Sequence, residues 1–206
     1  MRFVFLWVSI VLAAGAACGS GLPKYKYTEE PDPRNKDVVL GVGDTIAVNV
    51  WGPDNKDLNT EVTIRADGMI TMLLIGDIKA AGMTPAVLRK AIYDKVATFV
   101  KWPVVAKGTE PVVVVVKAWR SYIFTIQGEV QRQGVFTSDH FVTVTEAIAM
   151  AGGLTRFAKR GELKLFRTDL QSKETREIPL DYDMLVSGQR RDMNICVLAG
   201  DVIYVP

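Results

Sequence analysis

Cys18 is the residue whose neighbours point most directly to chemistry, and that chemistry is attachment of a lipid to its thiol. The small residues 15–17 before it would let a peptidase grip an extended backbone beside a diacylated cysteine, as in a lipobox. A leucine usually stands three residues before such a cysteine, whereas here the nearest one is Leu12. Ordinary signal-peptidase cleavage at an Ala-x-Ala site, formed by Ala14 and Ala16, is the alternative.

Residues 1–17 have the pattern of a secretory signal peptide. Arg2 gives the positive start, and the apolar run after it is shorter than the roughly 20 residues of a membrane-spanning helix. Gly19 follows Cys18 in place of an aspartate, a pattern that in lipoproteins at large favours the outer membrane. We therefore expect a lipoprotein anchored through Cys18 to the periplasmic face of the outer membrane.

The other polar side chains offer little material for catalysis or for a metal. His140 is the only histidine and stands in the turn-like stretch 137–140, where a solvated loop residue is the simpler interpretation. Asp181 and Asp183 lack further ligands at a suitable spacing. Cys196 lies in an apolar run, which predicts a small buried hydrophobic side chain. If Cys18 carries a lipid, Cys196 has no cysteine with which to form a disulfide. We expect no catalytic residue, no metal and no cofactor.

Aromatic residues that could stack on sugar rings are the second kind of chemistry in the sequence. They stand at the ends of expected strands and helices, and they are Trp51, Trp102, Trp119 and Tyr122. Aromatic rings at such positions more often pack in a core or at its rim. Both interpretations stay open.

Composition and charge are those of an ordinary globular protein. Of the 206 residues, 49% are hydrophobic and 23% are charged, and the formal net charge is +2. Nothing in this balance favours binding to nucleic acid. The stretch 18–37 is rich in Pro, Gly and alternating charges and lacks an apolar period, so we expect an extended, lipid-anchored linker there.

The first folded unit should span 38–119 and begin with strands. Apolar residues alternate over 45–51, which predicts a strand with one buried face. The runs 62–66 and 69–72 flank Asp67–Gly68, a pair able to adopt the positive φ angles of a two-residue turn. We expect these two runs to form a hairpin.

A helix and a further strand should complete this unit. Thr84 as N-cap and Pro85 at the first helical position begin the helix, which Pro103 should end. Apolar residues at spacings of three and four form one stripe, made of Val87, Leu88, Ile92, Val96, Phe99 and Val100. The apolar run Val112 to Val116 predicts a strand that is covered on both faces or lies in an interface.

The second unit should span 120–206 and wrap its strands on one short helix. Strands are expected over 123–126, 134–136, 163–167, 176–180 and 202–205. Thr143 and Glu146 have the spacing of a capping box, and Gly152–Gly153 should end the helix that it begins. These elements predict an α+β fold.

Tight turns are the role expected for a set of glycines and aspartates. Glycine tolerates strained dihedral angles, and aspartate bonds neighbouring amides. The set comprises Gly43, Asp44, Asp67, Gly68, Gly128, Gly152, Gly153, Gly200 and Asp201. Gly43–Asp44 and Gly200–Asp201 each precede a strand, but two short matches do not establish a repeat.

Short motifs follow one another in a fixed order along both units. The first unit contains Leu40-Gly41-Val42-Gly43-Asp44, Val50-Trp51, Ala66-Asp67-Gly68, Leu74-Ile75-Gly76, Ala81-Gly82-Met83-Thr84 and Pro111-Val112-Val113. The second contains Gly128-Glu129-Val130, Gln133-Gly134-Val135-Phe136, Thr143-Val144-Thr145-Glu146-Ala147-Ile148, Ala151-Gly152-Gly153-Leu154 and Gly200-Asp201-Val202-Ile203-Tyr204-Val205-Pro206. In this order they resemble the outer-membrane polysaccharide export family, with a soluble-ligand-binding β-grasp (SLBB) domain in the second unit.

The resemblance implies transport rather than catalysis. It implies an export domain, a mixed sheet with one long helix, followed by one SLBB domain, assembled as a homo-oligomeric ring. Such a ring conducts exopolysaccharide or capsule polymer and docks on an inner-membrane polysaccharide co-polymerase. Longer members continue into an amphipathic helix that crosses the outer membrane, whereas this chain stops at Pro206. A separate outer-membrane β-barrel partner is therefore expected.

A monomeric periplasmic saccharide-binding module, accessory to an envelope complex, is the alternative. A domain similar to the second unit could hold a soluble sugar without belonging to a conduit. Oligomeric state separates the two hypotheses, because a conduit must be a closed ring and a binding module need not be one.

Overall fold

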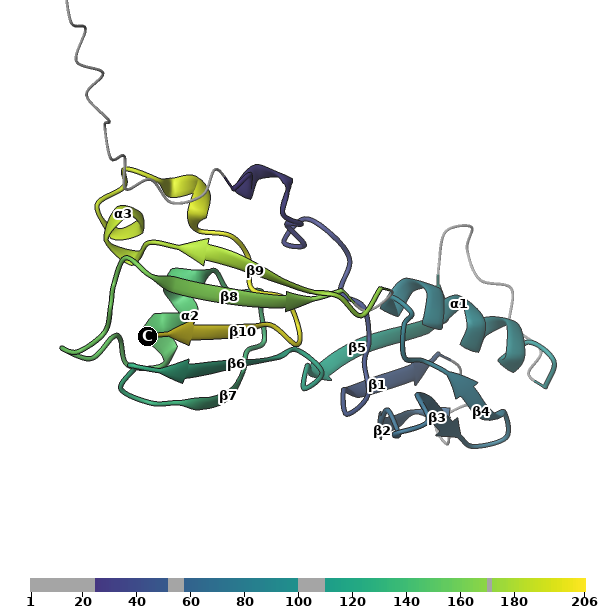
Figure 1. The fold of residues 1–206 in the computed structure, drawn as a ribbon. Helices are drawn as coiled ribbons and strands as arrows, with labels where there is room; N and C mark the ends of the chain where they lie inside the picture. The colour runs from purple at the N-terminus through teal and green to yellow at the C-terminus, as the bar shows by residue number, and fades with distance from the viewer. Residues whose placement is uncertain (1–24, 52–57, 100–109, 170–171) are drawn as a thin grey trace, which may run out of the picture.

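The computed structural model describes residues 25–51, 58–99, 110–169 and 172–206. They form two folded units that lie end to end, each with its own cluster of buried apolar side chains (Figure 1). No helix in these ranges is long and apolar enough to cross a membrane. The expected signal peptide, Cys18 and Trp102 lie outside the described residues.

The first unit is an antiparallel sheet covered by one helix. Strand β1 (Thr45–Val50) lies between β2 (Thr60–Thr63) and β5 (Val112–Ala118), while β3 (Met69–Met72) and β4 (Gly76–Lys79) form a separate ladder. Helix α1 (Pro85–Val96) packs beside β5. The inward residues of β1 are Ile46, Val48 and Val50, which confirms the predicted alternation.

Helix α1 begins where the sequence predicts and ends earlier. The Thr84 hydroxyl accepts a hydrogen bond from the Val87 amide, and a proline occupies the first turn. The helix ends at Val96, so Phe99 lies beyond it and is 65% exposed. Val87 is also exposed, because it lies outside the stripe that packs on the sheet, which is Leu88, Ile92 and Val96. Val100 and Pro103 lie outside the described residues.

The chain turns at Asp67–Gly68, but the predicted hairpin has other partners. Gly68 has a φ of 77° and donates its amide to the Arg65 carbonyl. The strands on either side do not form one ladder, because β2 pairs with β1 and β3 pairs with β4. The turn residues therefore predict where the chain reverses, but not which strands pair.

Strand β5 is covered on one face only within this chain. Val112 is buried and Val114 and Val116 pack on the core of the first unit, whereas Val113 and Val115 are 47% and 41% exposed. In the described sheet β5 is an edge strand. The prediction of cover on both faces is therefore wrong for the single chain, and the interface interpretation stays a prediction.

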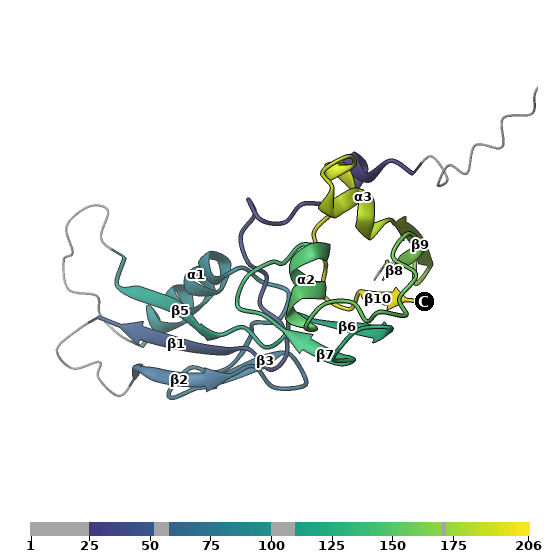
Figure 2. The same ribbon diagram turned by 90° about the vertical axis from the view of Figure 1, so that its left-hand side faces the viewer.

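The second unit is a five-stranded sheet with helices on one face. Its strands run in the order β7-β6-β10-β8-β9, and only β6 and β10 are parallel among the described pairs. The bounds are β6 Ile123–Gly128, β7 Gly134–Thr137, β8 Leu163–Thr168, β9 Thr175–Leu180 and β10 Val202–Val205. Helix α2 (Val144–Met150) lies on one face of the sheet (Figure 2), and α3 (Tyr182–Val186) follows β9. The predicted α+β fold is confirmed.

Helix α2 begins with the predicted capping box. The Thr143 side chain and the amide of the third helical residue interact, and the Glu146 carboxylate accepts a hydrogen bond from the Thr143 amide at 2.6 Å. Gly152 and Gly153 follow the helix with φ angles of 83° and 88°. Positive φ angles of this kind stop a helix, and glycine adopts them without steric cost.

Residues 25–30, here called the N-terminal strap, pack on the second unit although they precede the first. The strap contains a short 3-10 helix, Tyr27–Glu29, and Tyr27 is 3% exposed within the second core. The Tyr27 hydroxyl donates to the Pro179 carbonyl of β9. The extended-linker interpretation is therefore wrong for these residues, because the buried Tyr27 ring docks this polar segment on the second unit.

Candidate functional site

The loop before β1 folds around the carboxylate of Asp44. This residue has none of its surface exposed, and it accepts hydrogen bonds from the amides of Gly41, Arg120 and Ser121 and from the Ser121 hydroxyl. Gly43 before it has a φ of 89°. A Cβ on Gly41 would lie 2.3 Å from the Ser121 Cβ, so only glycine fits there. Asp44 thus fixes the segment that joins the two units.

The loop before β10 has the same arrangement. Gly200 has a φ of 86°, and the Asp201 carboxylate accepts a hydrogen bond from the Leu198 amide at 2.7 Å. Asp44 makes the equivalent bond, also at 2.7 Å, with the amide three residues before it. The two Gly-Asp pairs are therefore one kind of local turn, used twice.

A buried cluster of charges joins the strap to the second unit. The Arg167 guanidinium is 4% exposed and donates to the Asp201 and Glu30 carboxylates, with a shortest N–O distance of 2.6 Å to each. It also donates to the Cys196 carbonyl. Burial raises the pKa of Asp201, and the guanidinium opposes that shift. Removing either carboxylate would leave the buried cation short of a partner.

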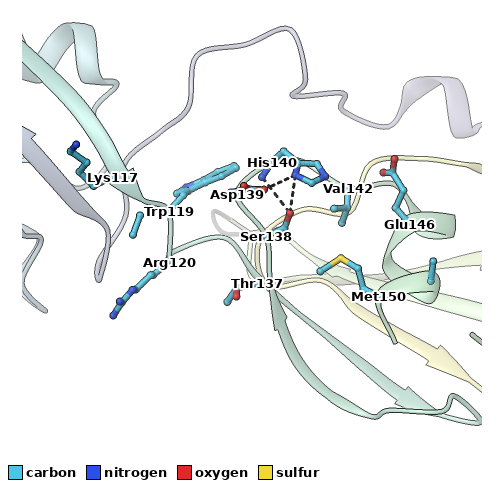
Figure 3. A pocket seen from close by; sticks show the side chains of 12 residues that line it. Lys117, Trp119, Arg120, Thr137, Ser138, Asp139, His140, Val142, Glu146 and Met150 are labelled. Carbon is cyan, nitrogen blue, oxygen red and sulfur yellow. Dashed lines mark hydrogen bonds and ion pairs between the residues drawn. The ribbon is translucent and has the colours of Figure 1, made fainter. Parts of the chain in front are cut away.

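A cleft of about 880 Å³ opens where the two units meet (Figure 3). One wall is the segment 117–120 that leaves β5, and the other walls are the loop 137–142 after β7 and one side of α2. Trp119 extends across the cleft toward Asp139 and His140 (Figure 3). Ligand sites often form at such a junction between folded units.

The polar groups of the cleft do not form a catalytic triad. The His140 Nδ1 atom lies 2.7 Å from an Asp139 oxygen and 3.3 Å from the Ser138 hydroxyl. A proton relay needs the hydroxyl and the carboxylate on different ring nitrogens, whereas here both contact the same one. The imidazole lowers the pKa of Asp139, and the Thr143 amide lowers that of Glu146, so both carboxyls are ionised at neutral pH.

Two of the predicted aromatic contacts stand together, but only one of them reaches the cleft. Trp119 stacks on Tyr122 with ring centroids 4.8 Å apart and meets Phe141 edge-on. Tyr122 is 1% exposed and donates its hydroxyl to the Val197 carbonyl, so its ring belongs to the core. Trp119 lines the cleft, and its Nε1 is the one buried side-chain polar atom without a hydrogen-bond partner among the described residues.

The other predicted residues lie apart from the cleft. Trp51 follows β1 at the end away from the junction and is 57% exposed. Asp181 caps α3 through the Met184 amide, and Asp183 pairs with Arg160. The Asp67 carboxylate binds Arg65 and the Met69 amide within its turn. At Gly128 a Cβ would lie 1.9 Å from the Val205 carbonyl oxygen, so only glycine fits there.

Sequence reasoning missed the Glu30–Arg167 contact, although one signal for it was present. Arg167 follows Leu163 and Leu165 at alternate positions of β8, so its side chain points inward. An arginine at an inward strand position requires a buried carboxylate. Nothing local identifies Glu30 as one of the partners, because 137 positions separate the two residues.

Comparison with protein-family models gives two matches in chain order. Residues 32–106 match the model described as polysaccharide biosynthesis/export protein, and residues 123–177 match the SLBB domain model. The first match lies over the first unit, and the second covers β6 to the beginning of β9. The chain therefore carries a polysaccharide biosynthesis/export domain followed by one SLBB domain.

Proposed function

We propose that the chain is a subunit of a closed, lipid-anchored ring that conducts exopolysaccharide or capsule polymer through the periplasm. The observation that carries this proposal is an export domain followed by an SLBB domain, with exposed valines on one sheet face of each. An inner-membrane co-polymerase and a separate outer-membrane partner are the expected neighbours of the ring. The ring passes polymer on without cutting or extending it.

The uncovered face of the first unit supports assembly with other copies. Val113 and Val115 project from β5 away from α1, and β5 has an open edge in the described sheet. Open edges and apolar faces invite pairing or packing with a neighbour. Identical subunits that pack head to tail close into a ring when the rotation between them fits.

The outer face of the second sheet offers a second exposed surface, apolar toward β7 and charged toward β9. Pairing places five residues side by side across the five strands, in the order Val135, Thr125, Val202, Phe166 and Glu177. Val135 is 67% exposed, and Tyr204 beside this row is 39% exposed. This face lies opposite α2, so nothing in the described chain covers it. The two faces could meet head to tail in neighbouring subunits.

Cross-linking in membranes tests the ring. One cysteine is placed at Val113 and a second at a position along the outer face of the second sheet, starting with Val135. Native Cys196 does not interfere, because burial raises the pKa of its thiol to about 11. We expect a ladder of cross-linked species that ends at one closed size. Monomer alone, in cells that are exporting polymer, would overturn the ring.

The cleft beside Trp119 favours a second candidate function. A monomeric saccharide-binding module needs such a cleft and needs no contact between copies. The two functions differ in the same experiment, since a binding module would give no ladder while still binding sugar. Deleting the gene adds a test in cells, because loss of a conduit should trap polymer inside while precursor synthesis continues.

A further inference from the structure

The cleft between the two units combines apolar surface with hydrogen-bonding groups. The Trp119 ring, Val142 and Met150 supply the apolar surface, and Ser138 and Asp139 stand on the facing loop. A pyranose ring matches this combination, because its C–H face is apolar and its hydroxyls both donate and accept hydrogen bonds. The cleft volume of about 880 Å³ lies within the range of small-molecule sites, about 300–1,000 Å³.

The charges of the cleft do not favour a phosphate or a nucleotide. Lys117 and Arg120 line its edge, but their charged ends point away from His140 and from α2 (Figure 3). The carboxylates of Asp139 and Glu146 are ionised and would repel an anion. The same carboxylates are good acceptors for sugar hydroxyls.

Packing alone does not explain why residue 119 is a tryptophan. A phenylalanine could also stack on Tyr122 and meet Phe141 edge-on. The indole adds a buried Nε1–H group that donates to no acceptor among the described residues, and this costs about 1 to 3 kcal/mol. Because that group is buried, the wider indole ring, rather than its N–H, is the surface that a ligand in the cleft would contact.

We propose that the cleft binds a pyranose segment of the exported polysaccharide. Trp119 is the stacking surface, and the Asp139 carboxylate and Ser138 hydroxyl bind sugar hydroxyls. The site rests on the proposed export function and names the place where polymer touches the subunit. Because the cleft lies between the two units, one sugar segment would contact both.

Titration of the full chain in detergent tests the site. The probe is a set of oligosaccharides, four to eight sugars long, made from the polymer that the producing cells export. Protein labelled with [15N]tryptophan should show one indole resonance that shifts saturably and is missing in Trp119→Phe. Calorimetry should show about five- to tenfold weaker binding for each variant, because Trp119→Phe reduces the stacking surface and Asp139→Asn removes a charged hydrogen-bond acceptor.

Matched variants outside the cleft provide the controls. Trp51→Phe and Asp183→Asn make the same chemical changes elsewhere and should leave the affinity unchanged. The site is refuted by an absence of saturable binding to the wild type, and equally by binding that neither cleft variant weakens. Cross-linking tests the ring independently of the sugar site. A closed ladder without sugar binding would refute the sugar site alone. Sugar binding by a permanent monomer would refute the ring alone.

Discussion

At the scale of single residues, two buried aspartates carry more of the structure than any group that could do chemistry. Asp44 and Asp201 each follow a glycine with positive φ and each accept the amide three residues earlier. The remaining acceptor positions of the two carboxylates bind different partners. Asp44 takes the amides of the joining segment, and Asp201 takes the Arg167 guanidinium. Each carboxylate thereby links its local turn to residues far along the chain.

Replacing Asp44 with alanine should destabilise the protein strongly. The change leaves three amides and one hydroxyl without an acceptor in a buried place, which we expect to cost about 3 to 5 kcal/mol. Asp67→Ala is the matched control, since that aspartate is exposed and holds only its own turn, and it should cost about 1 kcal/mol. Urea unfolding measures both, and equal losses would contradict this account of Asp44.

At the scale of elements, the strap shows how a short segment can be held by residues far along the chain. Tyr27 fills a place in the core of the second unit, and Glu30 adds the second carboxylate to Arg167. The chain then forms the whole first unit and enters the second unit again at Tyr122. The second unit is therefore assembled from two stretches of sequence that are far apart.

Tyr27→Ala should loosen the second unit selectively. Losing a buried aromatic ring typically costs about 3 to 5 kcal/mol, and here the loss falls on β9 and on the segment around Met193. Tyr25→Ala, at a half-buried ring on the same strap, should cost about 1 to 2 kcal/mol. Hydrogen exchange would localise the effect. Uniform loss of protection in both units would show that the strap is not specific to the second.

The capping box of α2 should make part of the stability depend on pH. Bonding to the Thr143 amide lowers the pKa of Glu146 from its ordinary value of 4.5, so the carboxylate stabilises the fold above that value and the contribution is lost as the pH falls. At pH 7 Glu146→Gln should be about 0.5 to 1 kcal/mol less stable than the wild type. Urea titrations at pH 7, 5 and 3 should show this gap closing, and a constant gap would contradict the mechanism.

Local signals predicted the elements better than their partners. Thr84–Pro85, the capping box at Thr143 and the alternation in β1 each specify a structure within one turn or one strand, and each is confirmed. The docking of the strap depends on residues far along the chain, which no local pattern encodes. Strand β3 pairs with the next strand, β4, rather than with β2, although Asp67–Gly68 is the stronger turn signal. The sequence identifies Trp119 as a candidate contact, but no local pattern places the loop 137–142 opposite it. The prediction that His140 is a solvated loop residue is confirmed, because 68% of its side chain is exposed.

At the scale of the whole molecule, the two units keep separate cores and meet at one short joining segment. Asp44 holds that segment through the Arg120 and Ser121 amides, and Trp119 stacks on Tyr122 beside it. In the proposed ring, head-to-tail packing would place the uncovered sheet face of one unit against that of the other unit in a neighbour.

Charging the outer face of β5 should therefore abolish assembly while leaving the subunit folded. Val113 and Val115 are about half exposed and lie outside the core, so Val113→Asp with Val115→Asp should change the unfolding free energy by less than about 1 kcal/mol. In a ring contact, by contrast, the two carboxylates would be buried without partners, and the cross-linked ladder and polymer export should both be lost.

Val87→Asp places a charge on an equally exposed valine of α1, and its ladder should match the wild type. The proposed lipid anchor would raise the effective concentration of subunits, so the comparison belongs in membranes rather than in dilute solution. A complete ladder from the double variant would remove β5 from the interface and leave the outer face of the second sheet as the surface to test next.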